Sequence, residues 1–163
     1  MRLVPGWAVG AAAVVVTVAQ AAPSPAPACP ALFAGRPMAL SLDALPAAVV
    51  TALDAKFAAG EAAGGKPIAP RDADWGATDV VSAGRPVPGR RFIGAGRRGT
   101  AWFVWYERGG IAHTYVAAVF ELADGAGPPR RIAHVQTTLD KLCAATIALL
   151  DSRGDRTPDG NDW

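Results

Sequence analysis

Apolar and polar positions alternate along this chain with two different periods, one helical and one typical of strands. Across residues 43–63, apolar side chains recur at helical spacing with charged residues between them. These apolar positions are Leu45, Val49, Leu53 and Phe57. We expect an amphipathic helix in this segment, with Asp43 as its N-cap and Gly64-Gly65 as its end.

Beyond Trp75 the period changes to two residues, which predicts strands. The predicted strands span residues 76–83, 90–95, 100–108, 111–122 and 131–137. A second helix is expected over 140–150, where apolar positions again share one stripe. The order of helix, hairpin-linked strands and helix is typical of the α+β class. We therefore expect an N-terminal helix packed on a four- to five-stranded antiparallel meander sheet, followed by a short C-terminal helix.

The dipeptide Gly109-Gly110 predicts how two of these strands pair. Both glycines can take positive φ, so we expect a two-residue hairpin connection that places Tyr106 beside His113. Side chains alternate between the faces of a sheet, so this register assigns each residue to a face. The almost wholly apolar face, which we expect to be the core, carries Phe92, Phe103, Trp105, Val116, Ala118, Phe120 and Leu122.

The opposite face carries aromatic side chains with polar tips, which are typical anchors of binding interfaces. Its candidate binding residues are Trp102, Tyr106, His113, Tyr115 and Arg91. There are two alternatives. This face lines a ligand pocket, or the C-terminal helix covers it and it is part of the core. For an exposed face, truncating Tyr106 or His113 should cost about 1 kcal/mol or less. The same change at Phe103 or Phe120 should cost roughly 3–5 kcal/mol.

Residues 1–21 have the three parts of a secretory signal peptide. Arg2 supplies the positive charge, and Ala19-Gln20-Ala21 is a small-x-small cleavage site. The apolar run over 8–19 is shorter than the roughly 20 residues that a membrane span needs. We therefore expect a periplasmic or secreted protein with no transmembrane span in its mature chain. The alternatives are an uncleaved anchor and lipidation at Cys29.

The chain has two cysteines, Cys29 and Cys143, and an even pair in an exported protein predicts a disulfide. A bridge closing so long a loop could stabilise the fold by roughly 4–5 kcal/mol. We expect three regions in the mature chain. Residues 22–41 form a Pro/Ala-rich lead-in, residues 42–151 a single α+β domain, and residues 152–163 a disordered polar tail.

The remaining motifs give no support for a cofactor or nucleic acid. Lysine and arginine number 16 against 14 aspartate and glutamate, and a near-neutral balance does not indicate nucleic-acid binding. Residues 94–99 match G-x-G-x-x-G, but an aromatic strand follows where a dinucleotide site needs a helix, so we interpret them as a hairpin turn. Residues 155–160 resemble the start of a calcium loop, but no helix flanks them.

Candidate catalytic groups are few. The chain has two histidines, and with both cysteines assigned to a bridge they do not make a set of zinc ligands. None of the serines lies in a nucleophile elbow. We therefore expect no metal and no cofactor, and we favour a non-catalytic protein while leaving the enzyme class open.

Four arginines form a second candidate site. Arg97 and Arg98 lie at one hairpin tip and Arg130 and Arg131 begin the last strand, so a meander brings them to the same end of the sheet. They could bind an anionic envelope component such as lipid phosphate or acidic glycan. The alternative is that they serve solubility and protect the sheet edge.

Together these features predict a small exported binding or accessory protein of the cell envelope, using the aromatic sheet face. Its partner, a protein or an anionic envelope component, cannot be read from the sequence. The alternative is a small exported enzyme or ligand carrier in which that face lines a pocket.

Overall fold

The computed structural model describes residues 22, 24–33, 35–57, 68–77, 87–123 and 127–152. The expected signal peptide lies outside these residues, as do residues 153–163 of the expected polar tail, so both stay predictions. Among the described residues no helix is long and apolar enough to span a membrane.

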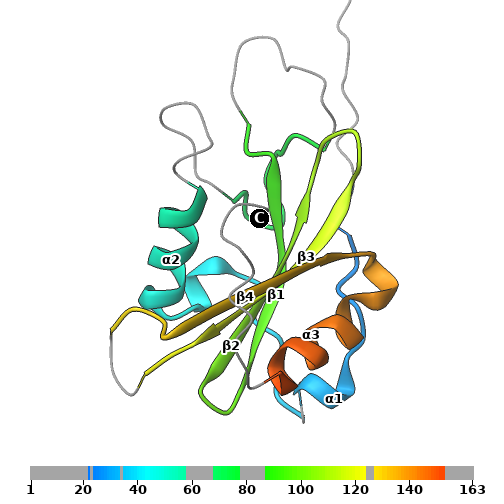
Figure 1. Ribbon diagram of the computed structural model, residues 1–163. Helices are drawn as coiled ribbons and strands as arrows, with labels where there is room; N and C mark the ends of the chain where they lie inside the picture. Colours follow the sequence, from blue (N-terminus) through cyan, green and yellow to red (C-terminus); the bar gives the residue numbers. More distant parts are fainter. Residues whose placement is uncertain are drawn as a thin grey trace, which may run out of the picture.

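Helices flank an antiparallel sheet in the described part of the chain (Figure 1). The elements are α1 (Pro30–Phe33), the 3₁₀ turn η1 (Leu42–Ala44), α2 (Ala47–Phe57), β1 (Arg90–Arg98), β2 (Ala101–Arg108), β3 (Thr114–Glu121), β4 (Arg131–Thr137), the 3₁₀ turn η2 (Leu139–Lys141) and α3 (Leu142–Asp151). The strands pair in the order β1-β2-β3-β4, every neighbour antiparallel, so the predicted α+β meander is confirmed. Residues 76–77 of the predicted first strand are not in a strand, and residues 78–83 lie outside the described range.

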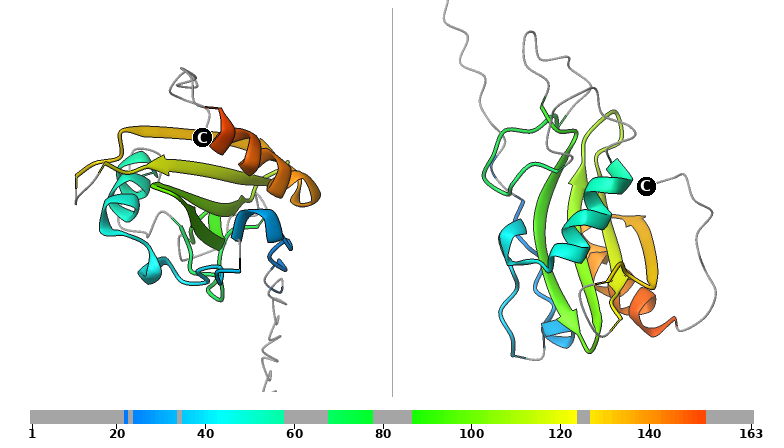
Figure 2. Two further views of the ribbon diagram at one scale, coloured as in Figure 1. Left: turned by 90° about the horizontal axis from the view of Figure 1, so that it is seen from below. Right: turned by 90° about the vertical axis from the view of Figure 1, so that its left-hand side faces the viewer.

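Helix α2 covers one face of the sheet, and α1 and α3 cover the other (Figure 2). The buried cluster beneath α2 contains Leu45, Val49, Leu53, Phe57, Ile68, Phe92, Ala95, Val104, Tyr106, Val116, Ala118 and Phe120. The cluster beneath α1 and α3 contains Cys29, Leu32, Ile93, Phe103, Trp105, Ala117, Val119 and Leu142. The sheet is therefore covered on both faces, and the predicted face with Trp102 and Tyr106 lies beneath α2 and not beneath the C-terminal helix.

A disulfide joins Cys29 to Cys143, as predicted, with the two Cα atoms 5.8 Å apart. It fastens the segment before α1 to helix α3 on the same face of the sheet. Beside it, the indole N–H of Trp105 donates to Thr146 Oγ1 (2.8 Å), so α3 also makes a polar contact with β2. Residues of the expected lead-in thus contribute a helix and buried side chains to the core.

The long helix begins at Ala47, and the prediction that Asp43 is its N-cap is wrong. Asp43 lies in η1, where its backbone N–H donates to the hydroxyl of Ser41 (3.2 Å). The cause is Pro46: the residue before a proline avoids the helical region, and Leu45 is extended with φ −84° and ψ 150°. The expected end of the helix at Gly64-Gly65 lies outside the described residues.

The register between β2 and β3 also differs from the prediction. Arg108 pairs with Thr114 and Tyr106 with Val116, so the connection spans residues 109–113 and the predicted two-residue turn is wrong. The reason is tertiary. Gly109 donates its N–H to the carbonyl of Gly89 (2.9 Å), and a Cβ on Gly109 would overlap the carbonyl oxygen of Gly76. The first glycine serves close packing against a neighbouring segment.

The predicted partner of Tyr106 was His113, and the observed partner is Val116, three residues further along the chain. Because side chains alternate between the faces of a sheet, a shift by an odd number of residues moves each β3 side chain to the other face relative to β2. Val116, Ala118 and Phe120 therefore share a face with Trp102, Val104 and Tyr106, beneath α2. Tyr115, Ala117 and Val119 share a face with Phe103, Trp105 and Glu107. The predicted division into an aromatic face and a core face is thus corrected.

Candidate functional site

A buried carboxylate, Glu107, lies near the end of β2 where the β2–β3 hairpin turns. In the register of β1 and β2 it stands directly opposite Arg91. Arg91 Nε donates to Glu107 Oε1 over 2.6 Å, and the two side chains are only 4% and 1% exposed. Two opposite charges in contact at one register position form a buried ion pair in the sheet.

The second oxygen of Glu107 also receives donors. His113 Nε2 lies 2.9 Å from Oε2, a geometry in which an imidazole N–H donates to a carboxylate. The hydroxyl of Ser24 donates to the same oxygen over 3.1 Å and lies 3.4 Å from the hydroxyl of Tyr115. Residues from β1, the hairpin loop and the N-terminal segment thus converge on one carboxylate, which fixes the position of the imidazole.

Three rings lie beside this pair, in tilted contact with one another. The guanidinium carbon of Arg91 lies 4.8 Å from the Trp75 ring centroid. The Trp75 and His113 rings are 5.6 Å apart, and the His113 and Tyr115 rings are 5.0 Å apart. The His113 side chain is 41% exposed, and Trp75 and Tyr115 are half-buried.

Ile111 extends this surface into the hairpin loop, where it is 98% exposed. We call Trp75, Ile111, His113 and Tyr115 the hairpin surface. It combines a fully exposed apolar side chain with rings that are fixed from below by the ion pair.

The N-terminal segment is tied to the same region. Arg91 Nη2 donates to the carbonyl of Ala22 (3.3 Å). Arg71 bridges two elements, donating to the carbonyl of Ile93 in β1 (2.6 Å) and to that of Ser24 (3.2 Å). These contacts hold the start of the described chain beside the hairpin surface.

The structure brings together three of the five candidate binding residues predicted from the sequence. Arg91, His113 and Tyr115 meet around Glu107, whereas Trp102 and Tyr106 lie on the opposite face of the sheet. Tyr106 is fully buried beneath α2, with its ring 5.5 Å from that of Phe57. Burial raises the pKa of Tyr106, and its hydroxyl makes no hydrogen bond within the described residues. Tyr106 is therefore a core residue.

Sequence reasoning missed the centre of the cluster. Glu107, Trp75, Ile111 and Ser24 were not among the candidate site residues. One signal was present: Arg91 near the start of one predicted strand and Glu107 near the end of the next carry opposite charges. Opposite charges within two adjacent strands favour direct cross-strand pairing.

The four arginines of the candidate anion patch have different environments. Arg97 and Arg130 are exposed, whereas Arg98 forms an ion pair with Asp151 at the end of α3. The side chain of Arg131 lies outside what the structure describes, although its backbone pairs with Glu121. A role in anion binding for this end of the sheet stays a prediction.

The imidazole of His113 is 41% exposed and lies beside the buried carboxylate. Ser24 gives its hydrogen bond to the carboxylate, so its hydroxyl is not lined up with the imidazole as a nucleophile would be. In the described ranges, histidine, cysteine and acidic residues do not gather into a group that could hold a metal ion.

Comparison with known proteins identifies no relative: no family model, no curated protein and no solved structure matches the chain.

Proposed function

We propose that this chain is an exported, non-catalytic binding protein of the cell envelope that docks on a partner protein through its hairpin surface. The observation that carries the proposal is the row of partly exposed rings held beside the buried Arg91–Glu107 pair. The leader predicted at residues 1–21 supports export, and the Cys29–Cys143 disulfide is compatible with an oxidising compartment.

The energetics of the buried Arg91–Glu107 pair favour a functional role over a stabilising one. Taking two charges out of water costs about as much as their attraction returns, so a buried salt bridge is a weak source of stability. Here the second oxygen of Glu107 contacts His113, whose ring faces solvent. A network that orients an exposed imidazole adds rigidity to the hairpin surface, and a rigid surface loses little entropy on binding.

The chemistry of the surface supports a protein as the partner. Aromatic rings with polar tips beside an exposed apolar side chain are typical of the anchor residues of protein interfaces. Ile111 is 98% exposed. A projecting hairpin with such side chains suits insertion into a complementary depression on another protein.

A small exported enzyme is the second candidate, and the Glu107–His113 contact of 2.9 Å favours it. Carboxylate–imidazole pairs of this kind act as general acids and bases. Substitution of Ile111 separates the two candidates, because a docking protein needs this exposed side chain and an acid–base centre at His113 does not.

Affinity capture with paired variants tests the proposal. The chain, expressed in its own cells with its leader and a C-terminal tag, is isolated with its bound proteins as wild type and as Ile111→Asp. Leu40→Asp is the matched control, because Leu40 is also an exposed large apolar residue, at 53%. We expect Ile111→Asp to lower recovery of a specific partner by about tenfold or more, and Leu40→Asp to leave it unchanged. Equal recovery with all three chains would overturn the proposal.

A further inference from the structure

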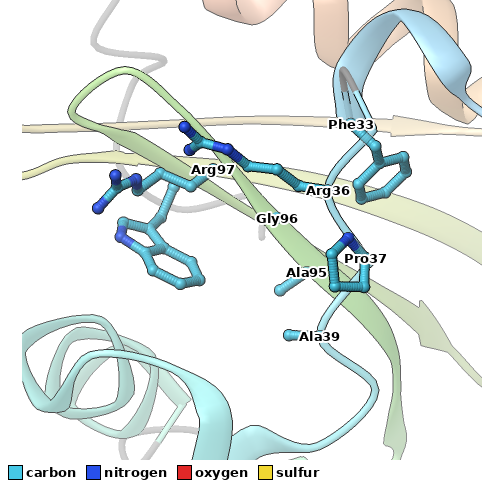
Figure 3. A pocket seen from close by; sticks show the side chains of 8 residues that line it. Phe33, Arg36, Pro37, Ala39, Ala95, Gly96 and Arg97 are labelled. Atoms are coloured by element: carbon cyan, nitrogen blue, oxygen red, sulfur yellow. The ribbon is translucent and has the colours of Figure 1, made fainter.

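A pocket of about 330 Å³ opens at the edge of the sheet, away from the hairpin surface (Figure 3). Its described lining residues are Phe33, Arg36, Pro37, Ala39, Ala95, Gly96, Arg97 and Trp102. They come from the end of α1, from the segment that follows it, and from the β1–β2 hairpin. This volume is at the lower end of the roughly 300–1,000 Å³ typical of small-molecule sites.

The backbone holds the walls of this pocket together. Gly35, with φ 77°, lets the chain turn after α1, and Ala39 then forms a two-way backbone bridge with Ala95 of β1 (2.8 and 2.9 Å). Residues 35–39 are thus fastened along the edge of β1. A side chain at Gly96 would collide with the rings of Phe33 and Phe103, so this glycine lets Phe33 close down on the strand. The pocket is a product of the fold.

Two guanidinium groups supply the charge of the pocket. Figure 3 shows the side chains of Arg36 and Arg97 extending to the same side, from the α1–α2 connection and from β1. Within the described residues neither forms an ion pair, and none of the residues lining the pocket is acidic. Neighbouring Arg98 differs, because Asp151 neutralises it. Two like charges without a counterion favour an anion between them.

The rest of the lining is apolar. Phe33 and Trp102 provide aromatic surface, while Pro37, Ala39 and Ala95 provide small aliphatic surface. Trp102 is half-buried, so its indole combines packing against the core with an accessible part. A ligand for such a site needs an apolar body as well as a negative group.

We propose that this pocket binds a small carboxylic acid with an aromatic ring, its carboxylate held by Arg36 and Arg97 and its ring against Trp102. Arginine suits a carboxylate because the planar guanidinium can donate two parallel hydrogen bonds. The small volume favours one or two rings over a long acyl chain. The site shares no residue with the hairpin surface, so the proposal stands or falls independently of the proposed function.

Binding of a model acid tests the proposal. The probe is 3-phenylpropionate, compared with its neutral amide and with inorganic phosphate, by calorimetric titration and by NMR shifts of the Trp102 indole. We expect saturable binding of the acid in the millimolar range or tighter. The neutral amide and phosphate should each bind at least about tenfold more weakly, because each lacks one of the two contacts.

Matched arginine variants locate the site. Arg36→Gln and Arg97→Gln should each weaken binding of 3-phenylpropionate by about tenfold, while their thermal melts stay close to that of the wild type. Arg130→Gln is the control, because Arg130 is exposed at the same end of the sheet but does not line the pocket. It should leave the affinity unchanged. The proposal is overturned if the acid does not bind, if the amide binds equally well, or if Arg130→Gln weakens binding as much as the pocket variants do.

Discussion

The carboxylate of Glu107 is held through both of its oxygens. It is 1% exposed, yet it receives hydrogen bonds from a guanidinium, an imidazole and a hydroxyl. In the low dielectric of a protein interior such a group is stable only while its partners remain. Single substitutions at this position therefore report on the whole cluster.

Glu107→Gln should lower the free energy of unfolding by roughly 3–5 kcal/mol, because Arg91 keeps its charge and loses its counterion. Urea denaturation measures this loss. Asp151→Asn is the control: it breaks the Arg98 pair, whose side chains are 38% and 63% exposed, and should cost about 1 kcal/mol or less. Equal losses in the two variants would contradict a buried pair at Glu107.

Tyr106 yields a second prediction at this scale, opposite to that from the sequence. Its ring is fully buried, so Tyr106→Ala should cost roughly 3–5 kcal/mol, as for other large core residues. Its buried hydroxyl has no hydrogen-bond partner in the described chain, so Tyr106→Phe should retain or increase the stability. Thermal melts of the two variants test both expectations, and a large loss in Tyr106→Phe would reveal a bond to that hydroxyl.

The same residue predicts a pH dependence. Burial raises the pKa of Tyr106 above its ordinary value of about 10, so the folded state retains a proton that the unfolded state releases. The stability that protonated Tyr106 contributes is therefore fully present below pH 10, and it decreases as the pH rises further. Above pH 10, wild type should lose stability more steeply than Tyr106→Phe, as measured by melts across an alkaline series. Parallel curves would contradict this account.

At the scale of elements, the sequence predicted the positions of most strands and helices well. It predicted the pairing register between strands poorly. The predicted strand at 131–137 coincides with β4, and the stripe from Leu45 to Phe57 is buried as expected. These features follow from local periodicity. The β2–β3 register does not, because it depends on contacts of Gly109 with residues 76 and 89 that the local sequence does not encode. Because this register was predicted wrongly, the five candidate residues that were assigned to one face lie on two faces.

Gly109→Ala tests this explanation of the hairpin. The added Cβ would overlap the carbonyl oxygen of Gly76, so the segment that carries Trp75 must move or the hairpin must shift. We expect a stability loss of about 1–3 kcal/mol and a change in the fluorescence of Trp75. Gly89→Ala is the control, because a Cβ there meets nothing within 4 Å. A hairpin that tolerates both changes equally would contradict the proposed close packing.

At the scale of the whole molecule, the disulfide and the covering of both faces act together. Cys29 and Cys143 lie 114 residues apart in the chain, and both pack on the face that α1 and α3 cover. The pairing could be predicted because only two cysteines exist. The contribution of the N-terminal segment to the second layer of helices could not, because the sequence pattern predicted a Pro/Ala-rich lead-in at 22–41 where the structure has α1 and buried Leu32.

Removing this bridge should be costly. In the chain-entropy model a loop of this length contributes roughly 4–5 kcal/mol, so the Cys29→Ala/Cys143→Ala double variant should melt well below the oxidised wild type. Adding a reductant should lower the melting temperature of the wild type and leave that of the double variant unchanged. Insensitivity of the wild type to reduction would contradict a stabilising role.

The proposed function is docking on a partner protein through the hairpin surface. Photo-crosslinking tests this proposal: a photoreactive residue is placed at position 111 in one chain and at position 40 in another, and both are irradiated in the cells that produce the chain. Both positions are exposed apolar sites, so nonspecific contact should affect them alike. The account predicts a discrete crosslinked species from position 111 that is absent from position 40. No discrete species from position 111, or the same species from both positions, would contradict it.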